Sequence, residues 1–207
     1  MQQPRTARHK ILEAAIRLIR AKGFAATTVD DLCAAAKVTK GAFFHHFASK
    51  EALGVAAAEF WSETTGGFFA AAPYHSHADP LGRVLGYLEF RKAVLAGKVP
   101  EFTCLAGTLV QETYDSSPAI RAACDAAISD HAALIEVDII AAMRERNMEP
   151  EWTARSLAFH TQAVLQGAFV LAKAKGGPEI AVESVEHLKR YIVMLFSDGV
   201  GSKPHRT

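Results

Sequence analysis

The sequence predicts an all-α protein of about nine helices, in which three short N-terminal helices precede a larger helical part. Apolar residues recur at three- and four-residue intervals along most of the 207 residues, and no segment alternates as a series of strands would. Threonine, serine and aspartate stand where the helices should begin, and glycine or proline where they should end. Half of the residues are apolar, which provides for a buried core and excludes general disorder.

The first four predicted helices follow closely on one another. Gly23 stops the first helix, and the Thr27–Thr28 pair caps the second. A turn at Lys37-Val38 leads to the third helix, and Ser49 caps the fourth, which Pro73 ends. The expected helices cover residues 6–22, 28–36, 39–47 and 49–72.

Five more helices are expected behind this point. Asp79 and Pro80 are typical of a cap followed by a first helical residue, after a polar connection. The segment Val99–Phe102 is expected to be a loop, and Glu149-Pro150-Glu151 is expected to begin a helix. The expected helices cover residues 79–97, 104–114, 118–147, 149–175 and 179–196.

Charge is distributed unevenly, although the whole chain carries a formal net charge of only +1. Residues 1–53 contain nine basic and four acidic side chains, which gives +5. The remaining residues, 54–207, contain 14 basic and 18 acidic side chains, which gives −4. We therefore expect two domains, 1–53 and 54–207, and a polyanion as partner of the first. A solvated helix surface is the other explanation of the charge alone.

Two short helices joined by a tight turn, within a basic three-helix unit, fit a helix-turn-helix motif. The second helix of such a motif enters the major groove with its N-terminal residues, here Thr39, Lys40, Gly41 and Ala42. Small residues let the backbone approach DNA closely, Lys40 can reach guanine or phosphate, and the Ala42 methyl can touch a thymine methyl. A plain helical hairpin is the alternative for the motif taken alone.

The same helix should be anchored by Phe43 and Phe47, which lie four residues apart and are expected to face inward. Its outer side and the neighbouring caps can contact phosphates. A metal site shared by adjacent histidines is not expected, because adjacent residues point about 100° apart on a helix. The expected phosphate contacts are Thr27, Thr28, His45, His46 and Lys50.

The segment from Thr27 to Leu53, TTVDDLCAAAKVTKGAFFHHFASKEAL, resembles the DNA-binding signature of TetR-family bacterial repressors. The length of the chain and its all-helical remainder agree with the architecture of that family. The resemblance implies a homodimer whose larger C-terminal domain binds an inducer. Inducer binding would release the N-terminal helix-turn-helix domain from a palindromic operator.

Three positions depart from the pattern of the family. Cys33 stands where alanine is usual, a conservative change at a small buried site. Lys37 stands in the turn where glycine is frequent, and a positive φ there would cost lysine about 1 kcal/mol. Phe44 stands where a tyrosine commonly contacts phosphate. It cannot donate that hydrogen bond, so Phe44 stays a DNA-binding candidate with packing as its other role.

Contacts with an inducer have a weaker signal. Aromatic side chains of the larger part can line a cavity between helices or simply fill its core. The polar residues can orient a ligand or make structural hydrogen bonds instead. The ligand-binding candidates are Phe60, Trp61, Phe90, Phe102, Cys104, Glu112 and His131.

The stretch Phe102–Glu112 resembles a segment of one TetR-family subgroup in which a Gly-Cys-Leu sequence can carry a cysteine that senses oxidants or electrophiles. Thr103 replaces that glycine here. A helix N-terminus favours the thiolate, so Cys104 is a candidate redox-sensitive residue and an alternative trigger. A buried, unreactive thiol is the other role of Cys104, and Cys33 and Cys124 are expected only to pack.

Dimerisation is expected to use the last two long helices, because two such helices from each chain can make a four-helix interface. Packing inside one chain is the rival explanation of their apolar stripes. These stripes comprise Leu157, Val164, Leu165, Ala168 and Leu171 in one helix and Ile180, Leu188, Ile192 and Leu195 in the other.

Signatures of other function classes are missing from the sequence. It has no Ser/His/Asp nucleophile signature, phosphate-binding glycine loop or metal-ligand cluster, so we expect no enzyme activity, cofactor or metal. Apolar stretches are broken well short of the ~20 residues of a membrane span, and the start lacks the apolar core of a secretory signal. With three cysteines that do not pair evenly, a cytoplasmic protein without a membrane partner is expected. A helical ligand-binding protein that no longer binds DNA remains the distant alternative.

Overall fold

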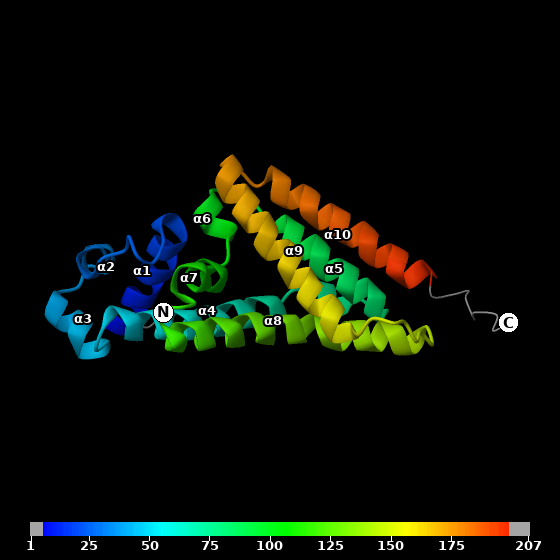
Figure 1. Cartoon of the computed structure of the whole chain (residues 1–207), viewed down its shortest axis with the longest axis horizontal. Helices are drawn as coiled ribbons and strands as arrows, with labels where there is room; N and C mark the ends of the chain where they lie inside the picture. Colours follow the sequence, from blue (N-terminus) through cyan, green and yellow to red (C-terminus); the bar gives the residue numbers. More distant parts are fainter. Residues whose placement is uncertain (1–5, 199–207) are drawn as a thin grey trace. The chain divides into compact units, whose positions relative to one another are not determined.

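A computed structural model describes residues 6–198, and all regular secondary structure in that range is helical. These residues form ten α-helices, nine of them with at least seven residues, and one 3-10 helix (Figure 1). The elements are α1 (Ala7–Lys22), α2 (Val29–Ala36), α3 (Lys40–His46), α4 (Lys50–Ala70), η1 (Pro73–Ser76), α5 (Pro80–Ala93), α6 (Val99–Phe102), α7 (Leu105–Thr113), α8 (Pro118–Glu145), α9 (Ala154–Lys175) and α10 (Glu179–Asp198). The all-α prediction is confirmed.

Local capping chemistry explains most of the helix ends. The hydroxyl oxygens of Thr6, Thr28 and Thr39 each accept a hydrogen bond from a backbone N–H in the first turn of α1, α2 and α3. Gly23 and Gly176 follow α1 and α9 with positive φ angles of 89° and 80°, which favour glycine. These starts and stops lie where the sequence predicts them.

Four predictions of local structure differ from what is observed. The helix expected over residues 79–97 ends at Ala93, and the polar connection before it contains the 3-10 helix Pro73–Ser76. Val99–Phe102 forms the short helix α6 instead of a loop. Pro150 and Glu151 precede α9 instead of beginning it, since the helix starts only at Ala154. The reason is a capping box, in which the Thr153 hydroxyl accepts from the Ser156 N–H and the Ser156 hydroxyl accepts from the Thr153 N–H.

The chain folds into two compact units that interleave along the sequence. Unit 1 contains the described residues up to Gly67 together with Val99–Ile128. Unit 2 contains Phe68–Lys98 and the described residues from Ser129 onward. The two domains expected from the sequence, 1–53 and 54–207, are continuous segments, whereas each of these units combines two segments. The expected domains stay a prediction about which part binds DNA and which binds a ligand.

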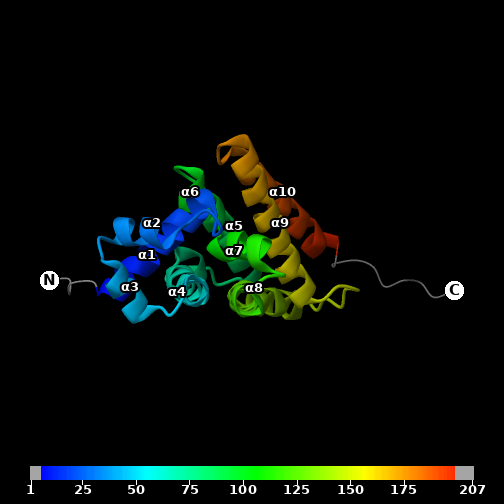
Figure 2. The same cartoon turned by 60° about the vertical axis from the view of Figure 1, so that its left-hand side comes forward.

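Unit 1 has one hydrophobic core shared by its short helices. In it α1 packs against α2, α3, α6 and α7, which Figure 2 draws together. Ile11, Ile19 and Leu32 are completely or almost completely buried in this core. Cys33 and Cys124 are buried in the same core, as predicted for packing residues.

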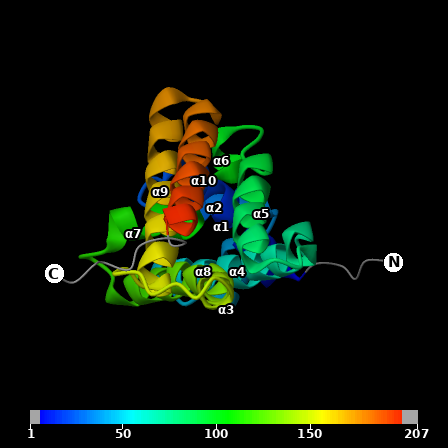
Figure 3. The same cartoon turned by 90° about the vertical axis from the view of Figure 1, so that its right-hand side faces the viewer.

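Unit 2 contains the antiparallel pair α9 and α10, which lie side by side in Figures 1 and 3, with α5 packed along α10. Leu157, Leu165 and Ala168 of α9 are buried within the chain, as are Leu188 and Ile192 of α10. These residues were expected in a dimer interface, and for them that expectation is wrong. Internal packing of the two helices explains their stripe.

A second set of apolar residues on the same pair of helices faces outward. Val170 and Leu171 of α9 and Tyr191 and Met194 of α10 are exposed, Met194 by 61%. Among the described residues, no helix is at once long enough and apolar enough to cross a bilayer.

Lys37 ends α2 in the left-handed region, with φ 55° and ψ 49°. A side chain with a Cβ is strained there, so we expect Lys37→Gly to raise the free energy of unfolding by about 0.5–1 kcal/mol. Urea denaturation at a fixed protein concentration measures the change. Lys37→Ala is the control, because it removes the amine but keeps the Cβ, and it should bring no comparable gain. Equal stabilisation by both variants would contradict the strain.

Candidate nucleic-acid interface

The start of α2 is fixed by a reciprocal pair of hydrogen bonds. The Thr28 hydroxyl accepts from the Asp31 N–H at 3.1 Å, and the Asp31 carboxylate accepts from the Thr28 N–H at 2.9 Å. Lys22 at the end of α1 donates to the same carboxylate at 2.7 Å. The Lys22 hydrogen bond, followed by those from Thr28, holds the pKa of Asp31 well below its usual range. The orientation of α2 against α1 is thereby set by charge as well as by packing.

The helix α3 is held from beneath by two aromatic side chains. Phe43 is completely buried and Phe47 is 4% exposed, and their ring centroids lie 5.8 Å apart. Thr39 caps the helix by accepting from the Ala42 N–H at 3.1 Å. The predicted inward anchoring of α3 is confirmed.

The opposite side of α3 is open to solvent. Thr39, Lys40, Gly41 and His45 are exposed, while Ala42 and His46 are partly exposed. A Cβ added to Gly41 would meet nothing closer than the Thr39 hydroxyl oxygen, at 3.7 Å. The first turn of α3 therefore exposes a lysine and small residues to solvent.

Lys40 carries the positive charge of this surface. Its amine lies 2.8 Å from a carboxylate oxygen of Asp30, on α2, and both side chains are largely exposed. The hydrogen bond and charge of Asp30 raise the pKa of Lys40, so the amine is protonated at neutral pH. An exposed ion pair is worth little in water, and Lys40 can exchange Asp30 for a phosphate at small cost.

Two of the residues expected to contact phosphate, Thr27 and Lys50, make hydrogen bonds within the protein. Thr27 is 1% exposed, and its hydroxyl donates to the Gly23 carbonyl at 2.7 Å, so its predicted contact is wrong. The Lys50 amine donates to the Ala25 carbonyl at 3.2 Å and lies 4.5 Å from the centre of the Phe24 ring. Lys50 is nevertheless partly exposed, and its phosphate contact stays a prediction. Both side chains tie down the loop between α1 and α2.

Phe44 is exposed, although packing is the alternative role that the sequence allows for it. Its side chain is 53% exposed, so packing is not its role in this structure. It meets the buried Phe43 edge to face, with ring centroids 5.2 Å apart. An apolar ring thus projects from the same outer side as Lys40 and His45.

Comparison with known proteins agrees with this geometry. Residues 11–57 match the family model of bacterial regulatory proteins of the tetR family, and residues 80–180 match that of the LmrA/YxaF-like transcriptional regulator C-terminal domain. The chain belongs to the TetR family. It is therefore a DNA-binding transcriptional regulator with a helix-turn-helix, from a family of non-enzymatic proteins.

Individual relatives show how far the likeness extends. The HTH-type transcriptional regulator YerO of Bacillus subtilis is 44% identical over 54 residues, which are 26% of this chain and 19% of YerO. Transcriptional regulator AcuR of Cereibacter sphaeroides is 27% identical over 106 residues, 51% of this chain and 48% of AcuR. The matched parts thus span a fifth to a half of these curated relatives. The crystal structure of regulatory protein TetR from Rhodobacter sphaeroides has the same fold, with a TM-score of 0.79, 22% identity and coverage of 89% of this chain and 98% of that one.

The ligand-binding candidates of this TetR-family chain are divided between the two units. Phe60, Trp61, Phe102, Cys104 and Glu112 belong to unit 1, whereas Phe90 and His131 belong to unit 2. Glu112 makes structural hydrogen bonds, since its carboxylate accepts from the Phe24 and Ala25 N–H groups at 2.9 and 2.8 Å. It joins α7 to the loop that leads into α2, and the expected role in orienting a ligand is wrong for it.

The aromatic candidates of unit 1 also have protein partners. The guanidinium carbon of Arg20 lies 4.8 Å from the centroid of the Trp61 ring. The rings of Phe60 and His9 meet edge to face, with centroids 5.0 Å apart. Phe102 is buried. These contacts indicate that core packing is the main role of the three rings.

The candidates of unit 2, Phe90 and His131, lie in a polar and aromatic cluster whose other members, Tyr87, Arg91 and Phe69, are not among the predicted ligand-binding residues. His131 Nε2 lies 3.0 Å from the hydroxyl of Tyr87, and burial, followed by the nearby charge of Arg91, lowers the pKa of His131 to about 3. Phe90 packs on Phe69 with centroids 5.4 Å apart. The sequence spacing of Tyr87 and Arg91 could have predicted this pair. They lie one helical turn apart on α5, and an arginine on an apolar helix face needs a hydrogen-bond partner.

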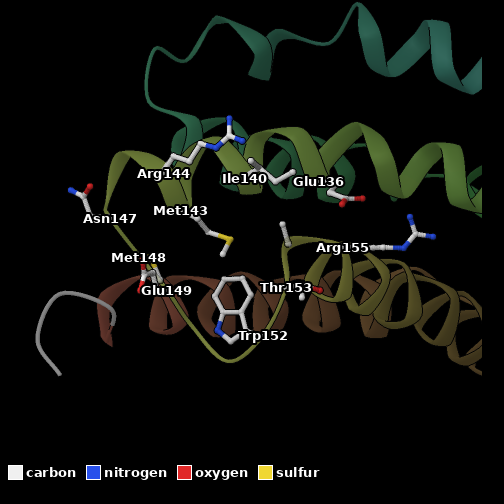
Figure 4. A pocket seen from close by; sticks show the side chains of 11 residues that line it. Glu136, Ile140, Met143, Arg144, Asn147, Met148, Glu149, Trp152, Thr153 and Arg155 are labelled. Carbon is white, nitrogen blue, oxygen red and sulfur yellow. The ribbon is translucent and has the colours of Figure 1, made fainter. Parts of the chain in front are cut away.

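A hollow of about 650 Å³ in unit 2 lies where α8 ends and α9 begins. Figure 4 shows Met143 of α8 and Trp152 of the connecting loop pointing toward one another across it. The Trp152 ring also contacts Phe196 of α10, with centroids 5.8 Å apart. Arg144 and Arg155 lie at its edge. In the part of the chain that the structure describes, no group of three or more His, Cys, Asp or Glu residues could hold a metal ion.

Proposed function

We propose that the chain is a cytoplasmic repressor that binds a palindromic operator as a homodimer and leaves it when a small molecule binds. The observation that carries this proposal is the two-sided nature of α3. One side is anchored by Phe43 and Phe47, and the other exposes Lys40 and Gly41 to solvent. Such a helix can enter a major groove without rearranging the core below it.

The contacts with DNA are proposed residue by residue. Thr39, Lys40, Gly41 and Ala42 would meet base edges and the adjacent backbone, with Lys40 exchanging Asp30 for guanine or phosphate. Phe44 would make an apolar contact, for instance with a thymine methyl group. His45, His46 and the exposed cap at Thr28 would lie at the phosphates.

The dimer is proposed to form through α9 and α10. Their outward residues Val170, Leu171, Tyr191 and Met194 form an exposed apolar surface, of the kind that marks interaction sites. Tyr191 lies against the ring of His160, with centroids 5.4 Å apart. Pairing two copies of this surface about a two-fold axis would also relate the two α3 helices by that axis. The two helices could then bind the two symmetric halves of a palindromic site.

The role of α3 is tested by Gly41→Ala. The added methyl has room in the free protein, and alanine favours a helix, so the variant should be as stable as the wild type or slightly more stable. Its methyl would stand between the backbone of α3 and DNA, so we expect at least about tenfold weaker binding to the DNA upstream of its own gene. Fluorescence anisotropy with labelled DNA measures this binding.

Gly66→Ala is the matched control, since it places a methyl in open space on α4 of the same unit. It should bind DNA as the wild type does. Equal binding by Gly41→Ala and the wild type would contradict the docking of α3. Failure of the wild type to bind any upstream DNA would favour a ligand-binding protein without DNA binding.

A second trigger is proposed at Cys104. It is the one cysteine of the three whose side chain is partly exposed, and its sulfur accepts the Gly107 N–H at 3.4 Å at the start of α7. Burial, followed by the Cys104 thiol, raises the pKa of Cys124 to about 12, so that second thiol is inert. Arg20 of α1 is near enough to interact with Cys104 through its charge. An adduct at Cys104 would therefore press on the core that supports α1.

Benzoquinone tests this trigger, because its ring carbon forms a bond with the thiolate sulfur and the quinone becomes a hydroquinone adduct without a leaving group. We expect treated wild type to lose at least about tenfold in DNA affinity and Cys104→Ser to keep its affinity. Unchanged binding of the treated wild type, or equal loss in both proteins, would contradict the role of Cys104.

A further inference from the structure

The hydroxyl of Tyr87 is the centre of a buried hydrogen-bonded cluster in unit 2. Its oxygen lies 3.0 Å from Arg91 Nε, 3.4 Å from Gln162 Nε2 and 3.0 Å from His131 Nε2. The arginine and the amide nitrogen can only donate, so the phenol accepts from both and donates its own proton to His131. The hydrogen-bonding capacity of Tyr87 is thus fully used within the protein.

Arg91 is the member of this cluster whose capacity is not used. A guanidinium has five N–H donors, and Arg91 gives one of them, on Nε, to Tyr87. Its two Nη atoms make no hydrogen bond to any residue in the range 6–198, and no acidic side chain of that range pairs with it. The side chain is partly exposed, so a ligand can reach it.

Three acidic residues of the surrounding helices, one each on α5, α8 and α10, are paired with other cations. Asp138 of α8 accepts from Arg83 Nε at 2.6 Å. Glu89 of α5 pairs with Lys92 at 2.7 Å and with Lys189, and Glu186 of α10 also pairs with Lys92. No counter-charge for Arg91 is therefore available from these pairs without breaking them.

Aromatic rings surround the cation. The Arg91 guanidinium carbon lies 4.7 Å from the centre of the Phe69 ring and 5.6 Å from that of Tyr87. Phe90 and His131 pack against Phe69 in turn, with centroids 5.4 and 4.6 Å away. The rings stabilise a cation in part, but they supply neither a hydrogen-bond acceptor nor a full negative charge.

We propose that Arg91 binds the carboxylate of a small organic acid whose apolar part packs against the partly exposed ring of Phe90. A carboxylate matches the planar fork of a guanidinium, and its single charge balances the single cation of the cluster. A doubly charged phosphate would bring excess charge into a site whose one histidine is neutral. This proposal rests on the proposed function, because the acid would be the small molecule that weakens operator binding.

The cluster also connects the ligand to the DNA-binding unit through the chain. Tyr87 lies on α5, Gln162 on α9, and His131 on α8, three residues beyond Ile128, where α8 passes from unit 1 to unit 2. A carboxylate that draws Arg91 away from Tyr87 alters the hydrogen bonds that hold these three helices. The helix α8 contributes residues to both units, so a ligand that changes the position of α8 in unit 2 can also change its position in unit 1.

Titration calorimetry with two acid–amide pairs tests the proposal on the full-length protein. The probes are benzoate against benzamide and hexanoate against hexanamide, which differ in charge but little in shape. We expect at least one acid to bind about tenfold more tightly than its amide and to weaken DNA binding. Arg91→Gln should remove this preference, and Arg91→Lys should keep part of it because it keeps the charge.

Arg144→Gln is the charge-matched control, since it removes an exposed arginine of unit 2 at the hollow between the end of α8 and the start of α9. It should bind the acids as the wild type does. The proposal is overturned if neither acid binds more tightly than its amide, if a folded Arg91→Gln keeps the preference, or if Arg144→Gln loses it. Should Arg91→Gln fail to fold by circular dichroism, full acid binding by Arg91→Lys overturns the proposal, and partial loss supports it. DNA binding without any acid is measured separately, so failure of the proposed function is recognised independently.

Discussion

The burial of Phe43 and Phe47 is the constraint on which the DNA-binding surface depends. The helix α3 has seven residues, and an isolated helix of that length is not stable in water. Burying one phenylalanine contributes about 1.5–3 kcal/mol, so two rings can hold the helix in place. The same anchoring decides which residues are left outside, namely Lys40, Gly41 and Phe44. Burial of these two rings therefore fixes both the position of α3 and the choice of residues that α3 exposes.

The support of α3 extends well beyond the three N-terminal helices. Glu112 of α7 binds two backbone N–H groups in the loop before α2, and Lys50 of α4 binds the Ala25 carbonyl of that loop. Leu105 and Leu109 of α7 and Ile120 of α8 lie in the same core as Phe43. A movement of α7 or α8 would therefore change the packing of the core that supports α3. In this way a signal from elsewhere in the chain can alter DNA binding.

Sequence patterns predicted the parts of the fold that local chemistry decides. Caps such as Thr28 and Thr39 and the inward pair on α3 depend on neighbours within four residues, and they were predicted. The roles of Thr27, Lys50 and Glu112 depend on contacts with the loop between α1 and α2, which no local pattern encodes. The stripe at Leu157 and Leu165 was ambiguous for a different reason. Packing within a chain and between chains requires the same apolar spacing, and only the structure separates the buried residues from the exposed ones.

Photocrosslinking from α3 tests most directly whether its outer side meets DNA. Phe44 and Phe68 have almost equal exposure, 53% and 51%, so each can be replaced by a benzoyl-phenylalanine with a similar chance of reaching solvent. If α3 lies in the major groove, position 44 should crosslink at two symmetric operator positions, about 34–36 Å or a multiple of that spacing apart, and position 68 should not crosslink. Crosslinks from position 68 alone, or bound DNA that neither position reaches, would contradict this placement of α3.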